Sequence, residues 1–179
     1  LSTIGMQHAD LQVVQVSVPG GLIEGFPVRV PISWTVTNDG QRGSLAATWS
    51  DQIILSRNAV LGDGDDQVVG SFTRFGSLFA GESYTRGETL TLPIGVAGDY
   101  RLFVRTDAQG QVYEGGADEN NNASPAVAVS LLTPFSDLVV DSVSAPVDAK
   151  GRDTIQVSWT VRNQGQDATH AQTWVERVV

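Results

Sequence analysis

Two blocks of this sequence occur twice, and this internal repetition constrains the fold more than any other feature. The block DLQVVQVSVP at residues 10–19 is followed 127 residues later by DLVVDSVSAP at 137–146. The block ISWTVTNDGQ at 32–41 recurs 125 residues later as VSWTVRNQGQ at 157–166, with seven of ten positions identical. Repetition at a nearly fixed spacing is typical of chains built from copies of one structural unit. We therefore expect a tandem repeat: a leading tail at 1–9, a complete domain at 10–132, a linker at 133–136 and a truncated second copy at 137–179.

Alternation of apolar and polar residues predicts that the repeated unit is made of β-strands. Between residues 28 and 36, every second residue is apolar: Val28, Val30, Ile32, Trp34 and Val36. This period of two places one face of a sheet in a core and the other face in water. Further strands are expected at 11–18, 48–56, 67–75, 84–92, 100–106 and 126–132, separated by turn-forming residues. Seven short strands at this spacing predict an all-β, immunoglobulin-like, seven-stranded antiparallel β-sandwich, with Trp34 and Trp159 as core residues. Tyr100 fits either a tyrosine corner or an ordinary core position.

Charge and composition argue against several classes of function. The net charge is −9, from 20 acidic and 11 basic residues, so the chain lacks the basic surface that nucleic acids and anionic membranes attract. Its apolar runs are too short for membrane insertion, and with no cysteine it can form no disulfide and no thiolate site. The two histidines, His8 and His170, lie outside the predicted complete domain, so no serine there has a histidine in its own domain to act as base. We expect no catalytic residues, no enzymatic activity and no organic cofactor.

Two acidic loops contain oxygen ligands of the kind that Ca²⁺ prefers. The longer loop, at 107–122, is the first choice, and the shorter loop, at 58–66, is the second. The candidate ligands are Asp107, Glu114, Asp118, Glu119 and Asn121 in the first, and Asp63, Asp65 and Asp66 in the second. The alternative is that both loops are solvated turns, because Asp, Asn and Gly are common turn residues. Asp51, on an apolar strand face, also needs a partner, which either backbone donors or a metal ion can supply.

The order of several short blocks resembles one bacterial family. The series DLVV…P, SWTV.N.G, W.DQI.LS, L.AGESYT, LP.G..G.Y.L.V.TD and VYE…ENNN resembles the CARDB domain, the cell adhesion related domain found in bacteria. In this chain the series extends from Asp10 to Asn122, and its opening blocks recur from Asp137. The resemblance implies an immunoglobulin-like fold, tandem repetition and a place in large bacterial surface or secreted proteins, but no particular ligand. The second copy has WVE at 174–176 where the first has WSD at 49–51, so a role of Asp51 need not carry over unchanged.

Two functions from different classes are compatible with these features. The first is a noncatalytic extracellular module, at the cell surface or secreted, that acts as an adhesion or stalk element, is stabilised by Ca²⁺ and contacts neighbouring repeats and an unidentified polysaccharide or protein. The alternative is an accessory polysaccharide-binding module of a secreted hydrolase, which would need exposed, coplanar aromatic rings. Phe72, Phe75 and Phe79 are the candidates for such a face. The partial second copy leaves the apolar residues of its strand at 155–161 without an opposing sheet, so we also expect a homodimer through residues 137–179 that results from truncation.

Overall fold

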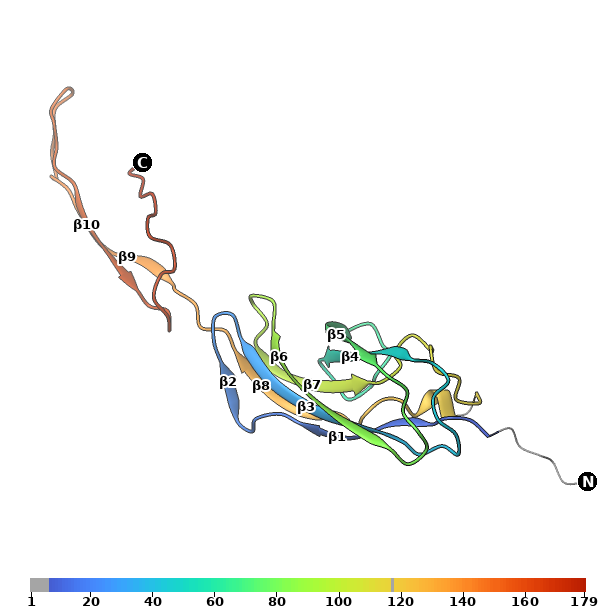
Figure 1. The fold of residues 1–179 in the computed structure, drawn as a ribbon. Helices are drawn as coiled ribbons and strands as arrows, with labels where there is room; N and C mark the ends of the chain where they lie inside the picture. Colours follow the sequence, from blue (N-terminus) through green and yellow to red (C-terminus); the bar gives the residue numbers. More distant parts are fainter. Residues whose placement is uncertain (1–6, 117) are drawn as a thin grey trace, which may run out of the picture. The chain divides into compact units, whose positions relative to one another are not determined.

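The computed structural model describes residues 7–116 and 118–179, which fall into two compact units (Figure 1). The first unit ends at Thr133, and the second comprises Pro134–Val179. The regular secondary structure of the described residues consists of β-strands and one short 3-10 helix, η1, at Asp118–Asn120. Among these residues, no helix has the length and apolar character needed to cross a bilayer.

The first unit is a sandwich of two β-sheets. One sheet has the order β1-β3-β6 and contains β1 (Leu11–Ser17), β3 (Arg29–Asn38) and β6 (Ser83–Thr91). The other has the order β2-β8-β7-β4-β5, with β2 (Leu22–Glu24), β4 (Thr48–Ser56), β5 (Gln67–Phe75), β7 (Gly98–Arg105) and β8 (Val127–Leu132). One cluster of buried apolar side chains, contributed by both sheets, fills the space between them. The predicted all-β, immunoglobulin-like sandwich is confirmed.

Strand β2 departs from the prediction of seven antiparallel strands. It is an eighth strand of the first unit, and it pairs with β8 in parallel, from Leu22 opposite Ser130 to Glu24 opposite Leu132. Only three residues take part, and glycines at 20, 21 and 25 flank them. A segment this short has no periodicity to detect. Its pairing carries the chain from the sheet of β1 to the edge of the other sheet.

The core explains the alternation seen in the sequence. The inward residues of β3 are almost fully buried, and Trp34 is only 1% exposed, as predicted. Trp49, Ile53 and Leu102 face them from the other sheet and are equally buried. Tyr100 is an ordinary core residue, with its ring packed beneath the guanidinium of Arg57 at 3.9 Å.

Packing of the first unit begins before the predicted boundary at Asp10. Ala9 is buried in the core, and the carbonyl oxygen of His8 accepts hydrogen bonds from the amides of Gln41 and Arg42. Residues 8 and 9, which the sequence placed in a leading tail, therefore belong to the sandwich. Strand β1 begins at the end of the sandwich where β3 and β7 finish. The loops 39–47, 76–82 and 106–126 lie at this same end, because they connect strands there. We call this end the first-strand end.

The second unit is a β-hairpin whose ladder has the same register as that of β1 and β3. Strands β9 (Leu138–Ser144) and β10 (Ser158–Asn163) pair from Leu138 opposite Asn163, as β1 and β3 pair from Leu11 opposite Asn38. Each ladder shifts register once, after its third pair. The two hairpins therefore share a β-bulge at the same position, and such bulges are specific features rather than defects.

The turn beyond each hairpin is also built in the same way. The side-chain oxygen of Asn38 accepts from the amide of Asp10 at 3.0 Å, and that of Asn163 accepts from the amide of Asp137 at 2.9 Å. Each of these asparagines also accepts from the glycine two residues later and donates to the carbonyl four residues later. The sequence blocks that repeat thus adopt the same local structure in both units.

Candidate metal centre

Asp107 shapes the loop of residues 106–126 that joins β7 to β8. Its backbone has a positive φ of 41°, and its side chain is 4% exposed. One carboxylate oxygen accepts from the amide of Gln111 at 2.7 Å, and the other accepts from the amide of Val112 at 2.8 Å. Burial raises the pKa of Asp107 above its usual value, although these two hydrogen bonds oppose the shift. Asp107 thus both forms the turn and directs a carboxylate toward the inside of the loop.

Glu114 ties this loop to the first strand. Its side chain is fully buried, with Oε1 accepting from the amide of Leu11 at 2.5 Å and Oε2 accepting from Asn122 Nδ2 at 2.6 Å. Its own amide donates to Glu119 Oε1 at 2.8 Å. Burial raises the pKa of Glu114 to about 7, and the charges of Asp107 and Glu119 add to this rise while the hydrogen bonds lower it. Burial first, and the neighbouring carboxylates second, therefore make Glu114 costly to ionise when no cation is bound.

Four side chains of the loop bring hard oxygen ligands together. Carboxylate oxygens of Asp107, Glu114 and Glu119 all lie within 4.8 Å of one another. Asn122 is 5% exposed, and its side-chain oxygen is buried without a hydrogen-bond partner, because only its Nδ2 is used by Glu114. We call Asp107, Glu114, Glu119 and Asn122 the loop cluster. All but Glu114 line a polar hollow of about 690 Å³, which gives small solutes access to the cluster.

The other two candidate ligands in this loop, Asp118 and Asn121, contact the segment before β1 instead. Asp118 lies 3.6 Å from His8 Nδ1, and Asn121 donates to Asp10 Oδ1 at 3.0 Å. The structure therefore joins three of the five predicted residues and adds Asn122, which was not among the predicted ligands. Asn122 also begins the sequence Asn-Ala-Ser, but its buried amide nitrogen is engaged with Glu114.

The second predicted cluster, Asp63, Asp65 and Asp66, is organised by its own hydrogen bonds. Carboxylate oxygens of the three residues lie within 4.8 Å of one another. Asn58 Nδ2 donates to Asp63 Oδ2 at 2.8 Å and to Asp65 Oδ2 at 3.0 Å, and Ser56 donates to Asp65 Oδ1 at 2.7 Å. The hydrogen bond from Asn58 lowers the pKa of Asp63. One oxygen of Asp66 is buried without a partner, but Asp63 and Asp65 are exposed to water. Exposure to water and the hydrogen bonds from Asn58 stabilise the charges of Asp63 and Asp65, so these two carboxylates need a cation less than the loop cluster does.

Asp51 accepts hydrogen bonds from side chains, whereas the sequence suggested backbone donors or a metal ion as its partner. It is completely buried, and its Oδ2 accepts from Trp34 Nε1 at 2.8 Å and from the Tyr84 hydroxyl at 2.7 Å. Its Oδ1 accepts from the Thr106 hydroxyl at 2.8 Å. Burial raises the pKa of Tyr84, and the charge of Asp51 adds to the rise. Because Thr106 precedes Asp107, this network connects the core directly to the base of the loop cluster.

The three phenylalanines considered as a sugar-binding face differ in how far they are buried. Phe72 is partly buried, and its ring packs against Trp34 with the centroids 5.6 Å apart. Phe75 and Phe79 are exposed, at 70% and 66%. They lie at the first-strand end, with Phe75 as the last residue of β5 and Phe79 within the loop that follows it. Any face for stacking on sugar rings is therefore reduced to these two side chains.

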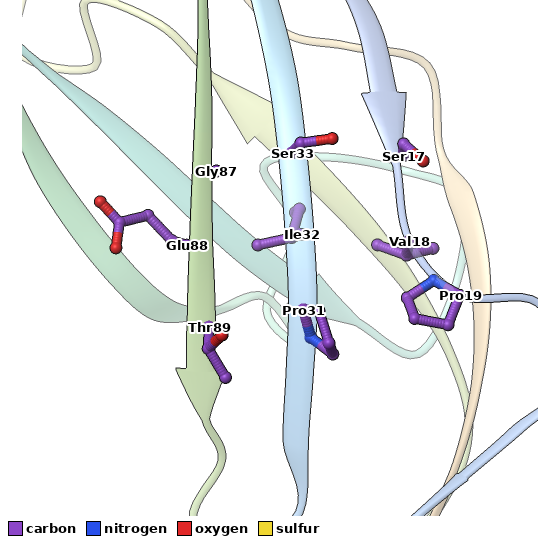
Figure 2. A pocket seen from close by; sticks show the side chains of 9 residues that line it. All are labelled: Ser17, Val18, Pro19, Pro31, Ile32, Ser33, Gly87, Glu88 and Thr89. Atoms are coloured by element: carbon purple, nitrogen blue, oxygen red, sulfur yellow. The ribbon is translucent and has the colours of Figure 1, made fainter.

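A second hollow lies along the sheet β1-β3-β6 (Figure 2). Ser17, Ser33 and Gly87 stand opposite one another on the three strands and leave little side-chain volume between them. Pro31 and Thr89 form the next row. Glu88 is the only charged residue that lines the hollow. This surface offers hydroxyl groups, and none of its lining residues belongs to the carboxylate clusters found among the described residues.

These features define an immunoglobulin-like β-sandwich module, and comparison with known proteins places it in a family. The chain belongs to the CARDB family, whose model matches residues 8–126. No curated protein matches the sequence.

Solved structures resemble the first unit at low sequence identity. The solution structure of a CARDB domain from Pyrococcus furiosus has 21% identity and a TM-score of 0.50, and the match covers 71% of this chain and 98% of that one. A crystal structure of that domain, in complex with di-metal ions, has 21% identity and a TM-score of 0.47, with 73% and 95% covered. A β-glucosidase from Erythrobacter marinus matches at 14% identity and a TM-score of 0.47, over 69% of this chain but 16% of the enzyme. The likeness to the solution structure supports the fold.

Proposed function

We propose that this chain is a noncatalytic module of an extracellular adhesion or stalk protein, in which Ca²⁺ bound at the loop cluster orders the first-strand end. The family and the sandwich fold support an adhesion-related module. The acidic surface, with a net charge of −9, favours cations as small partners. The shared register and turn of the two hairpins support a tandem array of such modules.

The observation that carries the proposal is the unpaired, buried side-chain oxygen of Asn122, whose amide nitrogen contacts Glu114 in a group of three carboxylates. An unpaired buried acceptor costs about 1–3 kcal/mol, and like charges within one small site add to that cost. A divalent cation removes both penalties at once. The carboxylate oxygens that accept backbone amides still have a second lone pair, so these hydrogen bonds do not prevent coordination.

The ligand set selects the type of metal. All four groups bind through oxygen, with no imidazole or thiolate among them, which disfavours zinc and other transition metals. Ca²⁺ accepts six to eight oxygens in flexible geometry, so water or backbone oxygens from the open hollow complete the shell. Mg²⁺ requires a stricter octahedral arrangement and retains its water more firmly. Extracellular Ca²⁺ sites commonly bind with a Kd of about 10⁻⁴–10⁻³ M, which suits a module outside the cell.

The bound ion would stiffen the module and would take part in no reaction. Glu114 already joins the loop to the amide of Leu11, where β1 begins. A cation that balances the charges of Glu114 and its neighbours would keep Glu114 ionised as the acceptor for that amide, and it would fix the loop against the entering chain. In a tandem array this end of the sandwich follows the preceding linker, so calcium would stiffen the region where force enters the module.

Calorimetric titration and thermal unfolding of the full chain test the proposal. We expect heat of binding in the range given above and a higher melting temperature in millimolar Ca²⁺ than in chelator, equivalent to about 1 kcal/mol. Glu119→Gln should abolish both effects, whereas Asp65→Asn, the matched control in the other acidic loop, should leave them intact. No heat and no shift in melting, or a loss caused only by Asp65→Asn, contradicts the assignment.

The accessory polysaccharide-binding function is a second candidate, favoured by the exposure of Phe75 and Phe79. Exposed rings bind sugars by stacking, and the acidic surface disfavours anionic polysaccharides, so neutral polysaccharides are the first ligands to test. Affinity electrophoresis in gels that contain such polysaccharides distinguishes the two functions. Retardation that is lost in Phe75→Ala and Phe79→Ala would favour this candidate over a purely structural role.

A further inference from the structure

The polar hollow beside the loop cluster lies on the outer face of the five-stranded sheet. Phe103 and Arg105 of β7 line it, and they alternate with residues that belong to the core between the sheets, so they lie on the opposite face. Residues of the loops 58–66 and 106–126 line the rest of it. Its volume of about 690 Å³ falls within the range of about 300–1,000 Å³ that is usual for ligand sites. The hollow therefore has the size of a binding site, and two loops from different parts of the chain form it.

Arg105 is the only basic residue among the described residues that line this hollow. It is partly buried at the end of β7, and Asp107, Glu119 and Asn122 line the same hollow. No carboxylate in the described part of the chain forms an ion pair with it. A guanidinium binds a carboxylate through two parallel hydrogen bonds, which makes arginine the usual residue for recognising such groups. The hollow thus presents a cationic group for which the described residues supply no anionic partner.

We propose that this hollow binds an acidic sugar of a polysaccharide, whose carboxylate coordinates the bound Ca²⁺ and pairs with Arg105. The proposal rests on the calcium site of the loop cluster. The four residues of that cluster leave room in the shell of Ca²⁺, which takes six to eight oxygens. Three of the four line the hollow, so an oxygen of a ligand in the hollow can replace a water on the ion. The same ion would then both order the loop and hold the ligand.

The charges in the hollow explain why such a ligand needs the ion. Without Ca²⁺, the carboxylates of the loop cluster repel a further anion, as does the acidic surface of the module. With Ca²⁺ bound, the two charges of the ion and the charge of Arg105 balance the three carboxylates. An anionic sugar then meets a neutral site that contains two groups able to bind its carboxylate. Calcium and the sugar should each raise the affinity for the other by the same factor.

The shape and lining of the hollow favour a sugar chain over an acidic side chain of a partner protein. A single Asp or Glu side chain would leave most of the 690 Å³ unfilled, whereas a short run of sugar residues fills it. Leu61 and Pro125 provide apolar surface for the C–H groups of sugar rings, while Asn120 and Ser124 provide polar atoms near their hydroxyls. This mixture of small apolar and polar surfaces suits a ligand that carries both along its length.

Calorimetric titration of the full chain with acidic trisaccharides tests the proposal. The probes are trisaccharides of galacturonic acid and of mannuronic acid, which differ in the orientation of their hydroxyls. In millimolar Ca²⁺ we expect saturable binding of at least one of them, and in chelator we expect none. A neutral galactose trisaccharide should bind at least about tenfold more weakly, because it has no carboxylate for the ion or for Arg105. Triglutamate is the corresponding probe for an acidic protein partner.

Three results of this titration would overturn the proposal. The first is no binding of either acidic trisaccharide in Ca²⁺, and the second is binding that chelation or loss of the carboxylates leaves unchanged. The third is tighter binding of triglutamate than of both sugars, which would indicate a protein partner instead. A chain that binds Ca²⁺ without binding the sugars contradicts this inference alone, whereas a chain that binds no Ca²⁺ contradicts the calcium site itself.

Two arginines of β7 provide a matched pair of variants. Arg105→Gln should weaken binding of the acidic trisaccharide about tenfold and still bind Ca²⁺ in the absence of sugar. Arg101 lies on the same face of the same strand and does not line the hollow, so Arg101→Gln should bind sugar as the natural chain does. Glu119→Gln should lose both ligands, because it weakens the hold on the ion. Equal sugar affinities of the Arg105→Gln and Arg101→Gln variants would refute a role of Arg105.

The number of waters on the bound ion provides an independent measurement. Tb³⁺ in place of Ca²⁺ emits light with a lifetime that lengthens as coordinated water is lost. We expect the acidic trisaccharide to lengthen this lifetime and the neutral trisaccharide to leave it unchanged. An unchanged lifetime at saturating acidic sugar would show that the carboxylate does not reach the ion, and it would overturn the proposal.

Discussion

Replacing Asp51 tests whether one buried carboxylate organises the core of the sandwich. Three side-chain donors converge on it at 2.7–2.8 Å: the indole of Trp34 and the hydroxyls of Tyr84 and Thr106. Asp51→Ala leaves all three donors buried with no acceptor at that point. The indole N–H cannot turn away, whereas Tyr84 and Thr106 can rotate their hydroxyl hydrogens.

The magnitude follows from the number and the type of these hydrogen bonds. A hydrogen bond to a charged group contributes about 1.5–3 kcal/mol, so three of them exceed the typical effect of a single substitution. Removal of the carboxylate also removes the cost of burying its charge, which offsets part of the loss. We expect Asp51→Ala to lower the free energy of unfolding by about 3–5 kcal/mol. Asp51→Asn should cost only about 1–2 kcal/mol, because its carbonyl can accept two of the donors while its amide donates to Thr106.

Urea unfolding of the full chain, followed by near-ultraviolet circular dichroism, measures these differences. Tyr84→Phe is the control, because it removes one of the three donors to Asp51. It also removes the hydroxyl that accepts from Trp49 Nε1 at 3.2 Å, so it should cost about 1–3 kcal/mol. The reasoning is refuted if Asp51→Ala costs less than Tyr84→Phe. Equal losses for Asp51→Ala and Asp51→Asn would also contradict it, since they would show that the hydrogen bonds contribute nothing beyond side-chain volume.

Four further outcomes are expected. Trp34→Ala should cost about 3–5 kcal/mol in the same unfolding assay, because it leaves a cavity in a closed core. Asn38→Ala should cost more than Asn163→Ala, because Asn38 is fully buried with four hydrogen bonds while Asn163 is exposed. Without Ca²⁺, the free energy of unfolding should fall by up to about 3 kcal/mol as the pH rises from about 5 to 7. The reason is that folding raises the pKa of Glu114 from 4.5 to about 7, so the folded state holds that proton more tightly than the unfolded state does. Glu114→Gln should flatten this part of the pH profile. Calcium affinity measured by calorimetry should increase as the pH rises through about 7, because the ion requires ionised Glu114.

The regular part of the fold could be predicted from the sequence because the alternation of apolar and polar residues within a strand shows which face of that strand is buried. The alternation along 28–36 identified both β3 and its buried face, and the repeat at 157–161 identified β10 in the same way. Strand β2 was missed because three residues carry no period, and its parallel pairing depends on where the chain crosses between the sheets.

The site could be predicted only in part, because its geometry depends on contacts between distant segments. Composition marked 107–122 as a candidate, yet nothing local distinguishes Asn121, which points to Asp10, from Asn122, which points to Glu114. The contact of Glu114 with the amide of Leu11 spans more than a hundred residues. The partners of Asp51 could not be predicted either, because Trp34 and Tyr84 lie on two strands of the opposite sheet and Thr106 lies in the loop after β7.

A crystal structure of the full chain grown in millimolar Ca²⁺ tests the central claim most directly. We predict an ion within about 2.3–2.6 Å of oxygens from the four residues of the loop cluster, including the side-chain oxygen of Asn122. Anomalous scattering from crystals in which Ca²⁺ is replaced by a lanthanide would distinguish such an ion from water. A loop without an ion at saturating Ca²⁺, or an ion held instead by Asp63, Asp65 and Asp66 alone, would contradict the proposed centre.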